Sequence, residues 1–439
     1  MPQEIIIGRN NSDKQLFGDK GLIYIGKHWV KMGQVTSLSN PVYLDVARSH
    51  VVLIAGKRGS GKSYTLGVIA EGITDLPEEV SKNIAPIIFD TMGIYWTMAY
   101  KNDKDYELLR QWKLESKNLP IKVFVPAGKT KLYDEKAIPY DKEFVIDVSE
   151  ISVEDWITTF GLNFLDSVSL VLERNLTQLI DSGKKFDIDD IIKKIQEDKN
   201  SDKKDINAAV NLMEAAKTWG VFASKKQTGV KISDVINAGV TTVVDLSAYS
   251  SLGTFNVRAL VIGLLCKKLF NERMDARKQE EIESVKRGID YLNYTDKRKM
   301  PMVWILIDEA HEFLPKDFKD KNAATDPLVQ VLREGRQPGL TLVLATQQPG
   351  QIHRDVMTQS DIILSHRVTA SFDIEALNLI MQNYTSAGIS SFLNNLPRLN
   401  GSAIILDDNS ERIYPIRVRP RFTWHGGEAP TTISVEKRI

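Results

Sequence analysis

The sequence is poor in cysteine and carries no excess of charge. Of its 439 residues only Cys266 is a cysteine, and Lys+Arg and Asp+Glu are equal at 57 each. A single thiol excludes an intrachain disulfide and is typical of a reducing compartment. Balanced charge excludes a surface coated with basic residues, but not a ring whose basic groups line only its pore.

Long hydrophobic runs and metal-ligand spacings are also missing. No apolar stretch approaches the length of a membrane helix, and MPQEIIIGRN lacks the apolar core of a signal peptide. None of the six histidines has a His or Cys partner at zinc-binding spacing. We therefore expect a cytoplasmic protein with no membrane partner and no zinc site.

The segment VVLIAGKRGSGKS, from Val51 to Ser63, organises the rest of the chain. An apolar, β-branched run predicts a buried strand, the glycines match G-x-x-x-x-G-K-[ST], and apolar residues then recur at helical spacing. Strand, glycine loop and helix together predict a site for ATP, with Lys62 at the β/γ-phosphates and Ser63 on Mg²⁺. The predicted nucleotide-binding residues are Gly56, Lys57, Arg58, Gly59, Ser60, Gly61, Lys62, Ser63 and Tyr64.

Further apolar runs predict an α/β fold around this loop. Runs at 84–89, 121–125, 144–148, 241–246, 303–307, 340–345, 362–368 and 403–406 predict strands, most of them alternating with helical segments. Such alternation predicts a mostly parallel sheet with ligands at the carboxyl ends of its strands. We divide the chain into a short N-terminal β element (1–45), a RecA-like core (46–150 and 241–410), an all-helical insertion (151–240) and an extended C-terminal arm (411–439). The N-terminal element is expected to be a few strands of a truncated barrel or a hairpin.

Two acidic residues follow the predicted strand VWILI. Asp308 is placed to ligate Mg²⁺ and Glu309 to polarise the attacking water, as phosphoryl transfer requires. Taken alone, the pair could be an acidic cap of a strand, but the phosphate loop makes a catalytic pair the better interpretation.

Polar residues and arginines near the next strand complete the predicted site. Gln347 ends that strand and is predicted to contact the γ-phosphate, with Gln348 as second choice. Arg333, Arg336 and Arg367 are candidates to stabilise the charge that develops on the transferring phosphoryl group of a neighbouring subunit; the alternative for each is a surface salt bridge.

Asp90 and the ten residues that begin two positions after it each allow two interpretations. Asp90 ends that strand and is expected to join the catalytic face or to orient Glu309. The following MGIYWTMAYK mixes aromatic residues with one lysine, which is compatible with a loop facing DNA, but core packing of Tyr95 and Trp96 is favoured.

Residues 308–311 spell DEAH, a motif of two-domain helicases, but motif order and spacing argue against that class. The GR-containing segment lies between these carboxylates and the next strand, and a helical insertion separates Lys62 from Asp308. The sequence instead resembles the HerA/FtsK superfamily of ring-forming DNA translocases, and HerA-like ATPases in particular. The resemblance lies in residues 49–73, VVDLS (243–247), VWILIDEAHEFLP (303–315), LREGRQPGLTLVLATQQPGQI (332–352) and RPRFTWHGG (419–427).

This resemblance implies a homohexamer that moves along double-stranded DNA with ATP and Mg²⁺, often beside a nuclease partner in DNA end processing or in defence against foreign DNA. It implies that Arg419 and Arg421 belong to an arm that reaches the next subunit. Two features depart from the family: the N-terminal β element is short, and the pattern D-x-x-G-E-Y has Ile94 in place of its glutamate. The alternative function is an ATP-dependent switch, an assembly protein or a genome-packaging ATPase that is not a helicase.

Overall fold

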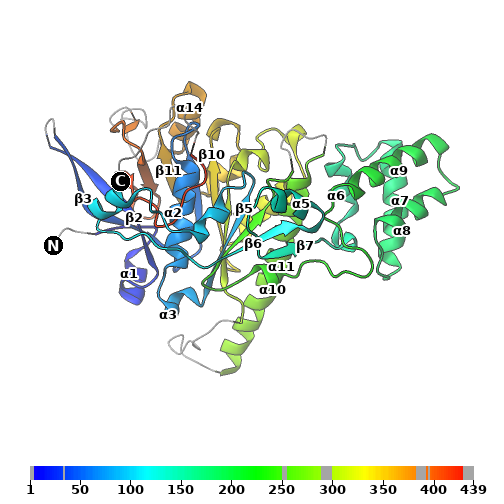
Figure 1. Ribbon diagram of the computed structural model, residues 1–439, viewed down its shortest axis with the longest axis horizontal. Helices are drawn as coiled ribbons and strands as arrows, with labels where there is room; N and C mark the ends of the chain where they lie inside the picture. Colours follow the sequence, from blue (N-terminus) through cyan, green and yellow to red (C-terminus); the bar gives the residue numbers. More distant parts are fainter. Residues whose placement is uncertain are drawn as a thin grey trace.

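The computed structural model describes residues 4–32, 35–249, 255–287, 299–381, 392–393 and 396–428. Its backbone forms a 13-stranded sheet in the order β1-β3-β2-β13-β12-β11-β4-β10-β9-β5-β8-β6-β7 (Figure 1). The strands are β1 (Ile5–Ile7), β2 (Leu22–Met32), β3 (Val35–Asp45), β4 (Val51–Ala55), β5 (Ile84–Asp90), β6 (Ile121–Pro126), β7 (Lys142–Phe144), β8 (Thr241–Asp245), β9 (Met302–Ile307), β10 (Leu340–Thr346), β11 (Ile362–His366), β12 (Ser402–Asp407) and β13 (Arg412–Val418).

The strands from β11 to β7 are all parallel, which confirms the predicted α/β core. Their sequences are continuous apolar runs because helices cover both faces of the sheet. The described helices are α1 (Asn11–Phe17), α2 (Lys62–Thr74), α3 (Glu78–Ser81), α4 (Tyr106–Gln111), α5 (Thr130–Glu135), α6 (Val153–Thr159), α7 (Ser167–Asp181), α8 (Ile188–Gln196), α9 (Lys203–Lys217), α10 (Ile232–Val235), α11 (Val257–Arg287), α12 (Thr325–Glu334), α13 (Arg354–Gln359) and α14 (Ser371–Met381).

Successive side chains of the central strands enter two different cores. In β4, Val52 and Ile54 pack with the apolar residues of α2, whereas Leu53 and Ala55 join the core that contains α11 and α12. This is the period-two alternation of a strand between two layers of helices. It fixes β4 in the middle of the sheet, so the loop that follows it emerges at the carboxyl edge.

The N-terminal segment forms a hairpin, which is the second of the two forms expected for it, and not part of a barrel. LIYIG and WVKM lie in one continuous strand, β2, which forms an antiparallel hairpin with β3. The hairpin joins the main sheet because β2 pairs with β13, and it lies at the opposite end of the molecule from the insertion (Figure 1). The short helix α1, between β1 and β2, was not predicted.

The proposed extended arm at 411–439 is also wrong over its described part. Residues 412–418 form β13, which pairs with both β12 and β2, and Arg419 and Arg421 are fully buried within the same chain. Apolar residues alternate along RIYPIRV, and they pack into the core from one face of the strand. The prolines and arginines of this segment hide that alternation in the sequence. Residues 429–439 lie outside the described part.

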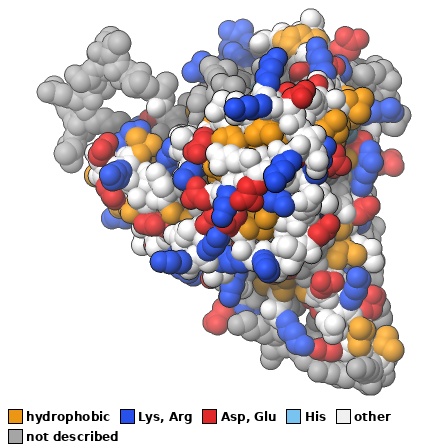
Figure 2. Space-filling view, turned by 90° about the vertical axis from the view of Figure 1, so that its right-hand side faces the viewer, with side chains coloured by type: hydrophobic (Ala, Val, Ile, Leu, Met, Phe, Trp, Pro, Cys, Tyr) orange, Lys and Arg blue, Asp and Glu red, His pale blue; other side chains and the backbone are white. Residues whose placement is uncertain are grey.

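The predicted insertion is helical, from α6 to α10. Ser152 and Asp155 form a capping box at the start of α6. The Trp156 ring stacks against the rings of Phe160 and Trp219, so this region has an aromatic core. On the end of the molecule that carries the insertion, basic and acidic side chains alternate around hydrophobic ones (Figure 2).

In the described residues, no helix is long and apolar enough to span a membrane.

Candidate nucleotide site

The phosphate loop uses left-handed backbone conformations that its glycines adopt without strain. Gly59 and Gly61 have φ values of 72° and 108°, and Gly61 directly precedes α2. A Cβ on Gly56 would lie 2.4 Å from the Ser60 Oγ and 2.8 Å from the His366 Cβ. The loop therefore excludes side chains where its backbone must turn, and it presents N–H groups at the start of a helix.

Lys62 is positioned beside the loop that it is predicted to serve. Its side chain is largely buried, and its Nζ donates a 3.3 Å hydrogen bond to the Lys57 carbonyl. Burial lowers the pKa of Lys62, whereas the carboxylates of Glu309 and Asp308 act to raise it. These opposing effects show that the ammonium and both predicted catalytic carboxylates share one electrostatic environment.

Asp308 and Glu309 follow β9 at the same edge of the sheet. The Glu309 N–H donates to the Asp308 Oδ1 at 2.9 Å, and the Glu309 backbone has a φ of 50°, which is uncommon outside glycine. Burial raises the pKa of Glu309 to about 7, and the adjacent Asp308 carboxylate acts in the same direction. The Glu309 Oε2 is buried without a hydrogen-bond partner. A buried, poorly solvated carboxylate at such a site suits a group that orients water.

Strand β10 lies between β4 and β9 and brings the third predicted element to the site. Its last residue, Thr346, accepts the Gly56 N–H at 3.3 Å, and its hydroxyl lies 3.3 Å from the His311 Nδ1. His311 is in turn 3.5 Å from the Glu309 Oε2. The half-buried Gln347 follows directly at the end of this strand, which lies between the strands that carry the phosphate loop and the carboxylates. Its contact with the γ-phosphate stays a prediction.

Two residues that support the loop were not identified from the sequence. The buried His366 lies 2.8 Å from the Thr65 Oγ1 through its Nε2 and 3.1 Å from the Ser402 carbonyl through its Nδ1. A carbonyl only accepts, so Nδ1 carries the proton and Nε2 accepts from Thr65. Burial lowers the pKa of His366 to about 4, which keeps the ring neutral beneath the loop. The second residue is Tyr95, whose hydroxyl lies 3.2 Å from the Asp308 Oδ2.

The predicted arginines do not gather at this site. Arg333 is exposed and pairs with Asp355 of α13 at 2.5 Å. Arg336 is exposed in the segment before β10, at the opposite end of that strand from Gln347. Only Arg367 is near the loop, because its carbonyl accepts the Lys57 N–H at 3.0 Å while its side chain is exposed.

The side chain of Tyr64, the last of the predicted nucleotide-binding residues, packs away from the phosphate loop. Its hydroxyl accepts the Arg421 N–H at 2.7 Å, and its ring packs edge-on against His425. The side chain thus faces the C-terminal segment. Only the backbone N–H of Tyr64 remains available to contact a phosphate at the loop.

The donor set fits a magnesium ion. Mg²⁺ in nucleotide sites takes one or two protein oxygens together with water and phosphate. Ser63 and Asp308 supply such oxygens, and the Tyr95 hydroxyl is 3.2 Å from both the Ser63 carbonyl and the Asp308 Oδ2, which places the two residues on either side of one group. In the described residues, no cluster of three or more His, Cys, Asp or Glu side chains offers a metal site made by protein alone.

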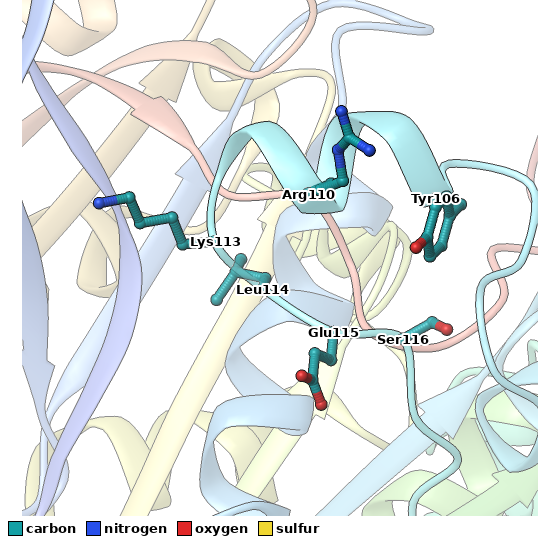
Figure 3. Close-up of a pocket in the computed structure, with 6 residues that line it drawn as sticks. All are labelled: Tyr106, Arg110, Lys113, Leu114, Glu115 and Ser116. Atoms are coloured by element: carbon teal, nitrogen blue, oxygen red, sulfur yellow. The ribbon is translucent and has the colours of Figure 1, made fainter.

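A separate open hollow of about 500 Å³ lies along α4. Figure 3 shows Tyr106 and Ser116 facing the same space, which Lys113 also lines. Its other lining residues, Arg110, Leu114 and Glu115, carry mixed charge, and none belongs to the predicted site. The hollow is therefore distinct from the nucleotide site.

A phosphate loop after β4, two carboxylates after β9 and the polar end of β10 between these two strands define a P-loop nucleoside triphosphatase. A family model described as "Helicase HerA, central domain" matches residues 30–269, which is more than half of the chain, and the chain belongs to this family. A second model, "Zonular occludens toxin (Zot)", matches residues 254–387. The resemblance inferred from the motifs is confirmed, and the chain is a P-loop ATPase of the HerA helicase family.

Individual relatives agree with this assignment. The chain is 23% identical over 373 residues to a probable DNA double-strand break repair helicase HerA of Methanocaldococcus jannaschii, covering 80% of this chain and 69% of that protein. It is 26% identical over 153 residues to the HerA helicase of Pyrococcus furiosus, covering 32% of this chain and 26% of that protein. The structure of VirB4 from Thermoanaerobacter pseudethanolicus shares the fold, with a TM-score of 0.57, 12% identity and coverage of 92% and 97% of the two chains.

Proposed function

We propose that this protein is an ATP-driven translocase or helicase that acts on double-stranded DNA as a homohexameric ring. The observation that carries the proposal is the convergence of Lys62, Asp308 and Glu309 with the end of β10 at one edge of the sheet. The names of the two HerA relatives, which refer to double-strand break repair, support DNA as the substrate and DNA end processing as the role.

In this mechanism each residue has a defined task. The Lys62 ammonium and the N–H groups of the loop hold the phosphates, and Gln347 contacts the γ-phosphate. Glu309 accepts a hydrogen bond from the attacking water and aligns it. A magnesium ion held by Ser63 and Asp308 would neutralise charge on the phosphate oxygens.

The placement of the arginines supports a ring. Arg336 is separated from Gln347 by β10, whose seven residues span roughly 20 Å. It therefore cannot reach the nucleotide of its own chain, whereas a neighbouring copy is the simplest recipient of Arg336 or Arg333. Arg367, next to its own phosphate loop, is better placed for the nucleotide bound to its own chain.

The steady-state rate of ATP hydrolysis, measured with and without linear duplex DNA, tests the proposal. We expect duplex DNA to stimulate turnover several-fold and Lys62→Ala to abolish it. An equal rate with and without DNA would favour an ATP-dependent switch and would contradict the motor. A nuclease partner is tested separately, by asking whether a nuclease purified with this protein degrades DNA ends only when ATP is hydrolysed.

Mixed rings test the shared site. Subunits that carry Lys62→Ala keep their arginines, and subunits that carry Arg336→Ala keep an intact loop. If Arg336 acts across the subunit boundary, mixing the two inactive variants should restore part of the activity. A matched mixture of Lys62→Ala and Arg333→Ala subunits shows which of the two arginines acts across the boundary. If ATP hydrolysis recovered in neither mixture, neither arginine would have this role.

A further inference from the structure

Tyr95 connects the two halves of the nucleotide site. It lies in η1 (Tyr95–Ala99), the 3₁₀ helix that follows β5, and its side chain is fully buried. Its hydroxyl is 3.2 Å from the Asp308 Oδ2 on one side and 3.2 Å from the Ser63 carbonyl on the other. These are the two residues predicted to hold magnesium, although Tyr95 itself is not among the predicted site residues.

The hydroxyl has one proton and two neighbouring acceptors. A carboxylate accepts a stronger hydrogen bond than a carbonyl does, so the proton is directed to Asp308. The Asp308 Oδ1 already accepts the Glu309 N–H at 2.9 Å. Tyr95 and the Glu309 backbone thus each hold one oxygen of Asp308 and fix the plane of its carboxylate.

Asp90 fixes the loop that carries Tyr95. Its Oδ1 accepts the N–H groups of Met92 and Gly93, at 3.0 and 2.7 Å, and its Oδ2 accepts those of Ile94 and Tyr95, both at 2.8 Å. Asp90 is itself fully buried at the end of β5. Four backbone hydrogen bonds to one buried carboxylate leave the loop little freedom.

The loop also approaches the segment after β8 closely, which requires glycine at position 93. Gly93 has a φ of 69°, and a Cβ at this position would lie 2.6 Å from the Ser247 Oγ. Ile94 contributes its backbone N–H to Asp90, so the absence of a glutamate at this position does not disturb the anchor.

We propose that Tyr95 is a positioning residue for magnesium, held in place by Asp90. Its proton goes to Asp308 and fixes the orientation in which that carboxylate meets the ion, beside the Ser63 carbonyl at the start of α2. Partners that orient a metal ligand in this way typically contribute about 10- to 100-fold in metal affinity. The inference rests on the proposed nucleotide site, but not on DNA translocation or on a ring.

The test is the Mg²⁺ concentration that half-saturates binding of a fluorescent, non-hydrolysable ATP analogue. In Tyr95→Phe we expect this concentration to rise about 10- to 100-fold, while binding of the analogue in EDTA stays unchanged. Tyr249→Phe is the matched control, because it removes a buried hydroxyl that donates 3.0 Å to the Trp219 carbonyl, outside this site. It should leave the Mg²⁺ dependence unchanged.

Asp90→Asn gives an independent second variant. A carboxamide has one acceptor oxygen and cannot accept four N–H groups, so we expect the loop to loosen and the Mg²⁺ requirement to rise as in Tyr95→Phe. An unchanged Mg²⁺ requirement in Tyr95→Phe, or an equal change in Tyr249→Phe, would overturn the proposal. Wild-type protein could bind the analogue with Mg²⁺ while duplex DNA leaves ATP turnover unchanged. That result would contradict the proposed DNA translocase but not the role of Tyr95.

Discussion

Two buried charge clusters flank α2, and they differ in how completely their polar atoms are paired. At the N-terminal end, Lys62, Asp308 and Glu309 share a poorly solvated edge where the Glu309 Oε2 has no hydrogen-bond partner. Along the helix, Glu71 is fully buried and receives hydrogen bonds from Arg419 and Arg421 at 2.9 and 3.0 Å.

In the second cluster, around Glu71, both carboxylate oxygens have more than one hydrogen-bond donor. Glu71 also accepts the N–H groups of Phe422 and Thr423, each at 3.1 Å, while the Arg419 guanidinium donates to the carbonyls of Tyr24 and Val68. A buried ion persists at low cost only when its partners are complete. We infer that the incomplete cluster is kept for chemistry, whereas the complete one joins the C-terminal segment to the helix after the phosphate loop.

The largest expected effect falls on the incomplete cluster. Glu309→Gln removes the acceptor that orients water and should slow ATP hydrolysis by about 10²- to 10⁴-fold. Binding of ATP should persist, and the free energy of unfolding should change little, because glutamine keeps the size of the side chain and the Glu309 Oε2 has no hydrogen-bond partner to lose. Rate and unfolding measurements on Glu309→Gln and on Glu334→Gln, an exposed glutamate of α12, check this. Rapid hydrolysis in Glu309→Gln would mean that another group aligns the water.

The complete cluster should behave in the opposite way. Glu71→Gln leaves two buried guanidinium groups without a counter-charge, which should cost about 3–5 kcal/mol in the free energy of unfolding. Glu79→Gln breaks an exposed pair with Lys20 and should cost less than about 1 kcal/mol. Urea unfolding measures both, and similar costs for the two variants would remove the distinction between the clusters.

A third buried cluster makes stability depend on pH. His50 lies between Asp361, at 2.7 Å, and Asp45, at 3.5 Å, and these carboxylates raise its pKa from 6.5 to about 9 despite the opposing effect of burial. Arg9 and Asp407 are the other charged groups that face this cluster.

The folded state therefore holds the His50 proton more tightly than the unfolded state does. The stabilisation is complete below pH 6.5 and is lost as the pH rises through about 9, by up to about 3 kcal/mol. Urea unfolding at pH 6 and pH 9.5 should show the loss in the wild type and a flatter dependence in His50→Gln. An equally steep dependence in His50→Gln would assign it to other groups.

The sequence predicted what depends on neighbouring residues and missed what depends on distant ones. The central strands and the phosphate loop follow from local hydrophobic runs and glycine spacing, and Asp308 and Glu309 follow from their place at a strand end. The Tyr95 contact with Asp308 joins residues 213 positions apart, and the Arg419 contact with Glu71 joins residues 348 apart. Such pairings are set by the order of strands in the sheet, which local patterns do not specify.

The C-terminal segment illustrates the same limit. Arginines, prolines and two glycines in residues 411–427 favoured an exposed arm, yet β13 pairs with both β12 and β2. Two arginines become core residues because one buried carboxylate on α2 receives both. A charged residue in a sequence is therefore a poor indicator of exposure when a distant residue of opposite charge is buried beside it in the fold.

The most direct test of the central claim is the mass in solution of the Glu309→Gln variant with Mg·ATP, in the presence and absence of a short duplex DNA. The variant should hold ATP without turnover and so preserve the assembled state. We predict a complex of six chains bound to one duplex. A protein that remained a single chain with ATP and duplex DNA present would contradict the proposed ring and the shared nucleotide site.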